Sequence, residues 1–149
     1  MPGSGSARSQ CRSTSPVAGA APPGETGWRI AIASLEQDAP PSRFLRVANL
    51  AVATSGDAWQ FVEIDGIRYS HILDPKTGIG LTTRSSVTIV APSGIASDAL
   101  ATAVNVLGPQ AGIKLVEETA ETEAFVLTQG DAGLTVHQTS GFDRLLDHP

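Results

Sequence analysis

The sequence has only one cysteine and no long apolar segment, which excludes an internal disulfide and argues against a membrane-spanning helix. A single cysteine cannot form a disulfide within the chain, so cysteine usage does not indicate a redox compartment. No apolar run approaches the roughly 18 residues that a membrane-spanning helix needs. We therefore expect no membrane span in this chain.

The sequence also lacks a basic excess and the common nucleotide and zinc motifs. Its formal net charge is -5 at pH 7, so it offers no basic surface for a phosphate backbone, and nucleic acid is not expected as a partner. It contains no Gly-x-Gly-x-x-Gly, no Walker loop and no Cys/His spacing typical of zinc sites. Any nucleotide or metal chemistry must therefore use other residues.

The length of 149 residues predicts one domain of ordinary size. Residues 1–27 are rich in glycine, proline and serine and contain few aliphatic side chains, which predicts a disordered leader. Order is expected to begin at Trp28, because large apolar residues occupy every second position from there to Ile32, the period of a half-buried strand. The folded part is therefore predicted to span residues 28–149.

The middle of the chain predicts strands and a hairpin. Apolar residues resume over residues 44–52, and two further apolar runs, 59–64 and 67–69, flank the dipeptide Asp65-Gly66. Both central residues of a tight hairpin turn need positive φ, which Asp-Gly supplies. The segment 71–80 contains proline and two glycines and is predicted to be a loop at a sheet end.

The second half combines strands with a pair of helices. Leu100, Val104 and Leu107 share one face of the first predicted helix, which we expect to be the buried face. The predicted elements are a strand at 87–91, a helix at 96–107 that stops at Gly108-Pro109, a shorter helix at 110–118, and strands at 124–128 and 134–137. The predicted fold class is α+β, mainly an antiparallel sheet with a helix pair.

Asp98 and Thr102 are four residues apart in the first predicted helix. That spacing places their oxygens on one face, about one turn from each other. A carboxylate with a neutral oxygen is a pair that Mg²⁺ accepts as ligands. The alternative is structural, because the helix dipole favours Asp in a first turn and Thr can bond back to an earlier carbonyl.

His71, Asp74 and Thr77 stand close together in the predicted loop. Such a loop can present an imidazole, a carboxylate and a hydroxyl to one small volume, and imidazole is the usual proton acceptor near neutral pH. The structural alternative is a turn in which Asp74 caps local amides while His71 packs.

A second polar segment, Thr-Ser-Gly-Asp at residues 54–57, lies between two apolar runs. Its backbone N-H groups could approach a phosphate. A bare connecting turn is the interpretation that this pattern favours.

Taken in order, these segments resemble the ApbE family of flavin transferases. The resemblance depends on their order and spacing and extends from about Trp28 to the last strand. The matching segments are Thr-Ser-Gly-Asp at 54–57, Tyr-Ser-His-Ile-Leu-Asp-Pro-Lys-Thr-Gly at 69–78, Ser-Val-Thr-Ile-Val-Ala at 86–91, Ser-Asp-Ala-Leu-Ala-Thr at 97–102 and Leu107-Gly108.

The resemblance implies a Mg²⁺-dependent FAD:protein FMN transferase. Such an enzyme splits the pyrophosphate of its substrate FAD, transfers FMN to a threonine or serine hydroxyl of an acceptor flavoprotein, and releases AMP. Some members instead hydrolyse FAD to FMN and AMP. By position, the resemblance assigns the Mg²⁺ ligands to Asp98 and Thr102, catalytic assistance to His71, and flavin binding to His71, Ile72, Asp74 and Thr77.

The sequence corresponds to the C-terminal half of that family's domain. The family's Ala-Lys-Gly segment, which supplies a further metal ligand and much of the flavin pocket, and a later Asn-x-Gly-Gly segment have no counterpart here. We therefore expect either a transferase completed by a separate N-terminal half or a non-catalytic flavin- or Mg²⁺-binding module. Family members are commonly exported or membrane-anchored, and this chain carries no signal that decides its localisation.

Overall fold

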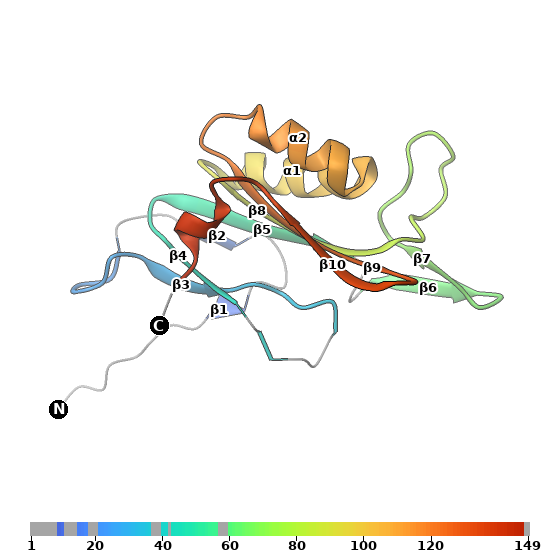
Figure 1. Cartoon of the computed structure of the whole chain (residues 1–149), viewed down its shortest axis with the longest axis horizontal. Coiled ribbons are helices and arrows are strands. Elements are labelled where there is room, and N and C mark those ends of the chain that lie inside the picture. Colours follow the sequence, from blue (N-terminus) through green and yellow to red (C-terminus); the bar gives the residue numbers. More distant parts are fainter. Residues whose placement is uncertain are drawn as a thin grey trace.

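Strand β8 (Arg84–Ala91) lies at the centre of the fold because its apolar residues are buried on both faces. The structure is a computed structural model and describes residues 9–10, 15–17, 21–36, 40–41, 43–56 and 60–147. Within this part, β8 is the middle strand of a five-stranded antiparallel sheet (Figure 1). From one edge to the other, the sheet contains β10 (Gly133–Gln138), β9 (Glu123–Gly130), β8, β5 (Leu50–Gly56) and β2 (Ser15–Val17).

One face of this sheet carries the helices α1 (Gly94–Leu107) and α2 (Pro109–Glu117). The side chain of Ser93 caps the start of α1 by accepting a hydrogen bond from the N-H of Ala96 at 3.2 Å. Gly108, at φ 78°, separates the two helices and Pro109 begins the second one, so the stop that the sequence predicts at Gly108-Pro109 is confirmed.

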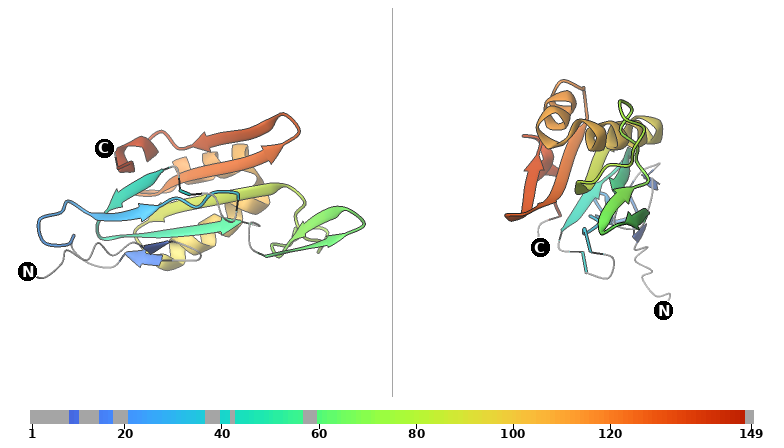
Figure 2. Two further views of the ribbon diagram at one scale, coloured as in Figure 1. Left: turned by 90° about the horizontal axis from the view of Figure 1, so that it is seen from below. Right: turned by 90° about the vertical axis from the view of Figure 1, so that its right-hand side faces the viewer.

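The other face is partly covered by a small sheet and the end of the chain, as Figure 2 shows. The small sheet contains, in this order, the strands β1 (Ser9–Gln10), β3 (Trp28–Ala31) and β4 (Phe44–Val47). The short 3-10 helix η1 (Phe142–Leu145) follows β10 and buries Phe142, whose ring stacks on that of Phe125 with centroids 5.2 Å apart. This face therefore has an aromatic centre.

The residues of β8, β5 and β9 alternate between two separate cores. On the helix side, Val87 and Ile89 pack with Ala101 and Val104 of α1. On the opposite side, Val90 packs with residues of β3, β4 and η1. The α+β class is confirmed, with an antiparallel sheet between a helix layer and a smaller strand layer.

A second hairpin projects from one end of the sheet. It consists of β6 (Phe61–Ile64) and β7 (Ile67–Ser70), joined by Asp65 and Gly66 at φ 52° and 76°. The predicted tight turn is confirmed, since both residues have the positive φ that such a turn requires.

Three features differ from the sequence prediction. The apolar run 44–52 is two strands, β4 and β5, because Asn49 at φ 55° turns the chain between them. Thr54–Gly56 are not a bend but the end of β5, where they pair with β8; Asp57 lies outside the described residues. Leu107, predicted to be buried, is 51% exposed, because α1 turns a row of smaller residues toward the sheet.

Much of residues 1–27 lies outside the described residues, so the disordered leader stays a prediction. Of this segment, β1 pairs in parallel with β3 and β2 pairs antiparallel with β5. In the part of the chain that the structure describes, no helix is both long and apolar enough to cross a membrane.

Candidate functional site

The exposed face of α1 carries the predicted metal ligands. Asp98 and Thr102 are both exposed and stand one turn apart. Val106 continues the same row by one further turn toward the end of the helix. The row therefore runs along the outer side of α1, away from the buried face.

The buried face of α1 is held by an amide. Asn105 accepts a hydrogen bond from the Ser85 hydroxyl at 2.6 Å and donates to the carbonyl oxygens of Ser55 at 3.1 Å and Ala101 at 3.2 Å. These bonds tie the last turns of α1 to β5 and β8. Because Asn105 is buried and its amide is bonded on both ends, it orients the helix as well as filling space.

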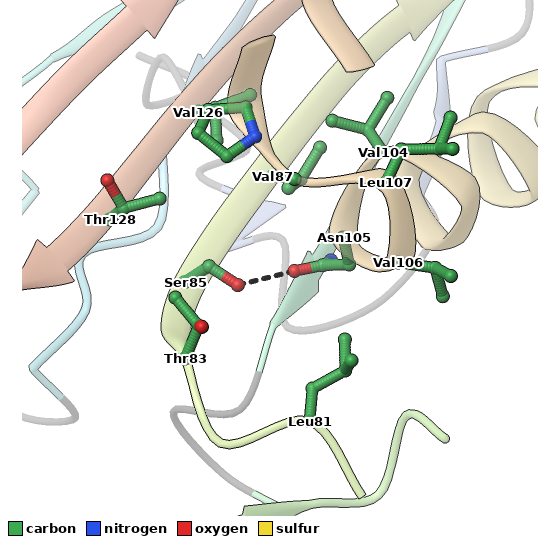
Figure 3. Close-up of a pocket in the computed structure, with 12 residues that line it drawn as sticks. Leu81, Thr83, Ser85, Val87, Val104, Asn105, Val106, Leu107, Val126 and Thr128 are labelled. Atoms are coloured by element: carbon green, nitrogen blue, oxygen red, sulfur yellow. Dashed lines mark hydrogen bonds between the residues drawn. The ribbon is translucent and has the colours of Figure 1, made fainter. Parts of the chain in front are cut away.

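A cavity of about 170 Å³ lies beside this amide, between the end of α1 and the start of β8 (Figure 3). Leu81, at the end of the predicted loop, points toward the helix end that carries Asn105 and Val106. Thr83 and Ser85 add hydroxyl groups to the wall. The row that contains Asp98 and Thr102 thus ends at a cavity that the loop helps to form.

The loop between β7 and β8 is closed by hydrogen bonds between its two arms. The N-H of Ser70 donates to the carbonyl of Leu81 at 2.8 Å, and the N-H of Leu81 donates to the carbonyl of Ile72 at 2.9 Å. Nearer the tip, the N-H of Asp74 donates to the carbonyl of Ile79 at 2.9 Å. The predicted loop is confirmed, and it rises on the helix side of the sheet (Figure 1).

The tip of the loop is shaped by Asp74 and Thr77. The Asp74 carboxylate accepts from the N-H of Lys76 at 2.8 Å, and its carbonyl accepts from the N-H of Gly78 at 2.8 Å. The Thr77 hydroxyl accepts from the N-H of Ile79 at 3.3 Å. Gly78 adopts φ 69°, a conformation that favours glycine. In this structure both side chains therefore serve the turn.

His71 is exposed at the base of the loop. Its Nδ1 lies 3.1 Å from the carbonyl oxygen of Gln60. A carbonyl oxygen only accepts, so Nδ1 is the donor and carries the proton, which leaves Nε2 of the neutral ring as an acceptor. In a neutral ring, the contact with Gln60 therefore favours the tautomer that leaves Nε2 free to accept a proton.

Ile72, predicted to contact flavin, points into the protein. Its side chain is only 7% exposed, and its N-H and carbonyl are hydrogen-bonded to the Ser70 hydroxyl and to the N-H of Leu81. In this conformation Ile72 anchors the loop rather than presenting a side chain.

The predicted site residues form two groups, one in the loop beside the end of α1 and one on α1 itself. His71, Asp74 and Thr77 share the loop beside the end of the helix, whereas Asp98 lies seven residues before Asn105, about 10 Å along the axis at 1.5 Å per residue. Thr102 lies between them. Among the described residues, no group of three or more His, Cys, Asp or Glu side chains could hold a metal ion.

The structural roles of Asn105 and Ser85 were not predicted from the sequence. A polar residue at an inward helix position resembles an ordinary surface residue, and Ser85 precedes the apolar run that predicted the strand. The detectable signal was the helix period, since Ser97, Ala101 and Asn105 recur every four residues.

Comparison with known proteins places this chain in a family. Residues 14–126 match the ApbE family. The chain is 36% identical over 121 residues to the FAD:protein FMN transferase of Vibrio cholerae, covering 80% of this chain and 36% of that protein. It is 41% identical over 88 residues to the FAD:protein FMN transferase of Treponema pallidum, covering 58% of this chain and 24% of that protein.

Solved structures agree with the sequence matches. The apo flavinyl transferase ApbE of Pseudomonas stutzeri superposes with a TM-score of 0.70 at 33% identity, covering 94% of this chain and 43% of that one. An ApbE protein of Thermotoga maritima has a TM-score of 0.70 at 30% identity, covering 86% and 41%. The chain therefore spans well under half the length of these relatives.

Proposed function

The chain belongs to the ApbE family, and from this premise we propose that it forms the C-terminal part of an FAD:protein FMN transferase. In the proposed reaction, a threonine or serine hydroxyl of an acceptor flavoprotein attacks the FMN phosphorus of FAD. The pyrophosphate P-O bond breaks and AMP leaves. The hydroxyl proton passes to a base of the enzyme, so charge and atoms balance.

The contact between His71 Nδ1 and the Gln60 carbonyl is the observation that supports this proposal most directly. The Gln60 carbonyl holds the proton on Nδ1, so Nε2 is the free acceptor that removing a hydroxyl proton requires. The ring is exposed, so a substrate hydroxyl can reach it. We assign the general base to His71.

Asp98 and Thr102 fit a Mg²⁺ ion. Mg²⁺ is commonly bound through one or two carboxylates, with waters and substrate phosphate oxygens as the remaining ligands, so one carboxylate and one hydroxyl suffice on this chain. Both side chains are exposed on one face of α1. When bound, the ion would neutralise charge on the pyrophosphate.

We assign flavin binding to the loop around His71, with different contributions from its residues. Ile72 would act as the buried anchor of the loop, because its side chain points inward. Asp74 and Thr77 would hold the tip in shape for FAD through the hydrogen bonds they already make. Their proposed role is thus to position the loop.

The rest of the site would come from polypeptide outside this chain. The chain covers 36% of the Vibrio cholerae relative, so a complete flavin pocket needs a further segment, in the same or a separate protein. The same coverage favours a second candidate function, a flavin- or Mg²⁺-binding module without transferase activity.

The test uses the chain joined to the N-terminal part of the Vibrio cholerae relative. FMN attached to an acceptor flavoprotein is measured by in-gel flavin fluorescence, with and without Mg²⁺. Asp98→Ala should slow transfer by about 100- to 1000-fold, the usual cost of losing one well-placed electrostatic group. Asp131→Asn, an exposed change in the β9–β10 turn, is the control and should leave the rate unchanged.

Two His71 variants separate proton transfer from loop position. His71→Asn retains a donor near the place of Nδ1 but lacks Nε2, so it should slow transfer by about 100-fold or more while the loop stays in place. Wild-type rates in both Asp98→Ala and His71→Asn would refute the proposed roles. AMP release without attached FMN would instead indicate FAD hydrolysis, and FAD binding without AMP release would indicate the non-catalytic module.

A further inference from the structure

A hollow outside the proposed site lies on the opposite face of the sheet. It has a volume of about 360 Å³ and lies between the segment that follows β3 and the strands β8, β9 and β10. Small-molecule sites typically have volumes of about 300 to 1,000 Å³, so this cavity is within that range.

The alternation of strand residues separates this cavity from the one beside α1. Phe125 and Leu127 of β9 line the large cavity, whereas Val126 and Thr128 line the cavity beside α1. Successive side chains of a strand point to opposite faces. The two cavities are therefore separated by the thickness of the sheet.

The wall of the large cavity carries two arginines in a protein that is acidic overall. Arg43, Arg84 and one acidic residue, Glu36, line it, while the formal net charge of the chain is -5. Among the described residues of its wall, the cavity thus has a positive excess of one charge, the opposite sign to the whole molecule.

Arg84 has an unused hydrogen-bond donor at this wall. Its Nη2 donates to the carbonyl of Leu35 at 2.6 Å, which fixes the guanidinium against the segment after β3. Its Nε is buried and has no hydrogen-bond partner among the residues that the structure describes. A buried donor without a partner costs free energy, and the guanidinium of Arg84 brings its full positive charge to this wall, where it would stabilise an anion in the cavity.

The remaining wall is apolar and partly open. Leu134 and Val136 of β10 are 57% and 43% exposed, and Leu127 lies beside them on β9. Arg43 covers the ring of Phe125, with its guanidinium carbon 5.1 Å from the ring centroid. The apolar part of a ligand would be removed from water by packing against these aliphatic side chains, which is favourable.

We infer that this cavity binds a small amphipathic carboxylate, with its apolar body on Leu127, Leu134 and Val136 and its carboxylate at the guanidinium of Arg84. A monoanion matches the single positive excess of the wall. An apolar body matches the β10 side chains. This binding uses neither FAD nor Mg²⁺ and is independent of the proposed transferase reaction.

Octanoate and its uncharged analogue octanamide test this assignment directly. Each is titrated into ¹⁵N-labelled chain of full length at pH 7, and amide shifts are followed by NMR. Octanoate should shift the amides around Leu35, Leu127 and Leu134 and bind at least tenfold more tightly than octanamide. Octanoate shifts that instead centre on Leu81 and Val104, or equal affinities for the two compounds, would overturn the inference.

Arginine variants then identify the anion-binding group. Arg84→Gln should weaken octanoate at least tenfold and leave octanamide unchanged. Arg144→Gln removes the same charge from an exposed position in η1 and should leave both affinities unchanged. If Arg84→Gln fails to fold, Leu134→Asp replaces it, because a carboxylate on the β10 wall should abolish octanoate binding. Retained octanoate affinity in the folded variant would contradict the assignment.

Competition separates this site from the proposed flavin site. FAD with Mg²⁺ should leave octanoate binding unchanged, because the two ligands would occupy opposite faces of the sheet. Displacement of octanoate by FAD would overturn the inference without affecting the proposed transferase function. Conversely, loss of transferase activity in Asp98→Ala would leave octanoate binding intact.

Discussion

The two faces of the central sheet are closed in different ways. On the helix face, α1 and α2 cover the strands, and the buried amide of Asn105 has partners on both ends. On the opposite face, β3, β4 and η1 cover only part of the sheet, and Leu134 remains 57% exposed. The helix face is thus mostly covered, with a cavity of about 170 Å³ at the end of α1, whereas the opposite face retains a hollow of about 360 Å³.

The difference follows from the size of the inward side chains. Small residues such as Ser97 and Ala101 let α1 lie close against β5 and β8, and the cavity on this side lies at the end of the helix. On the other face, large residues such as Phe125 and Phe142 fill the centre but leave the β10 edge uncovered. Close packing therefore fixes the orientation of the Asp98 and Thr102 row, while loose packing leaves room for a ligand.

The largest expected effect is on the aromatic core of the open face. Phe142→Ala should lower the free energy of unfolding by about 3 to 5 kcal/mol, because Phe142 is fully buried and its stacking partner Phe125 loses contact. Thermal and urea unfolding measure this. Phe61→Ala, in the exposed face of the β6–β7 hairpin, is the control and should cost less than about 1 kcal/mol. Equal losses of unfolding free energy in the two variants would show that the stacked pair of Phe125 and Phe142 does not stabilise this face.

The next effect concerns the amide that ties α1 to the sheet. Asn105→Ala should cost about 1 to 3 kcal/mol, because the Ser55 carbonyl loses a buried donor. A double-mutant cycle with Ser85→Ala measures the coupling energy between the Asn105 amide and the Ser85 hydroxyl. Gln110→Ala, at an exposed position of α2, is the control. An unchanged melting temperature in Asn105→Ala would mean that side-chain packing alone holds α1 in place.

A smaller effect is expected at the start of α1. Ser93→Ala removes the cap on the N-H of Ala96 and should cost about 1 kcal/mol, measured by urea unfolding. Ser93→Asp can cap in the same way and should retain most of the stability. If Asp fails to rescue where Ala destabilises, the hydroxyl would be acting through something other than capping.

The smallest effect is a pH dependence on the open face. The hydrogen bond from Arg46, with a second from Arg29, holds the pKa of the Asp147 carboxyl below its usual range. A depressed folded pKa contributes stability above the unfolded pKa of about 3.9 and loses it as pH falls through the folded value. Wild type should therefore exceed Asp147→Asn in stability at pH 6, and the difference should shrink as the pH falls below about 3.9.

Melting curves between pH 3 and pH 7 measure this difference. The partners are partly exposed, so the gain should be below that of the other three variants and should decrease with salt. Asp131→Asn, in an exposed turn, is the control. A difference that grows as the pH falls would contradict the assigned direction.

Local chemistry was enough to predict several elements from the sequence. Asp65 and Gly66 produced the expected tight turn, because the required positive φ is a property of those two residues. Gly108 and Pro109 separated the helices for the same kind of local reason. The apolar periods predicted the strands and the helix pair, and with them the α+β class.

The candidate site was less predictable than the elements. Asp74 and Thr77 were expected in one loop, and the structure shows them bonded within its turn, but no local pattern indicated that Gln60 would select the tautomer of His71. That contact joins the start of β6 to the loop after β7, and it depends on the hairpin that brings them together. Partners of this kind come from distant parts of the chain.

The sequence by itself determined most of the helices and strands, their order and the residue types available for chemistry, because turns, caps and hydrophobic periods depend on neighbouring residues. Only the tertiary structure decided that Thr54–Gly56 extend β5, that α1 buries Asn105 instead of Leu107, and that Arg84 and Ser85 point to opposite faces. The reason is physical. Strand pairing and helix packing are decided by contacts between segments far apart in the chain, and these outweigh the weak local preferences of polar residues.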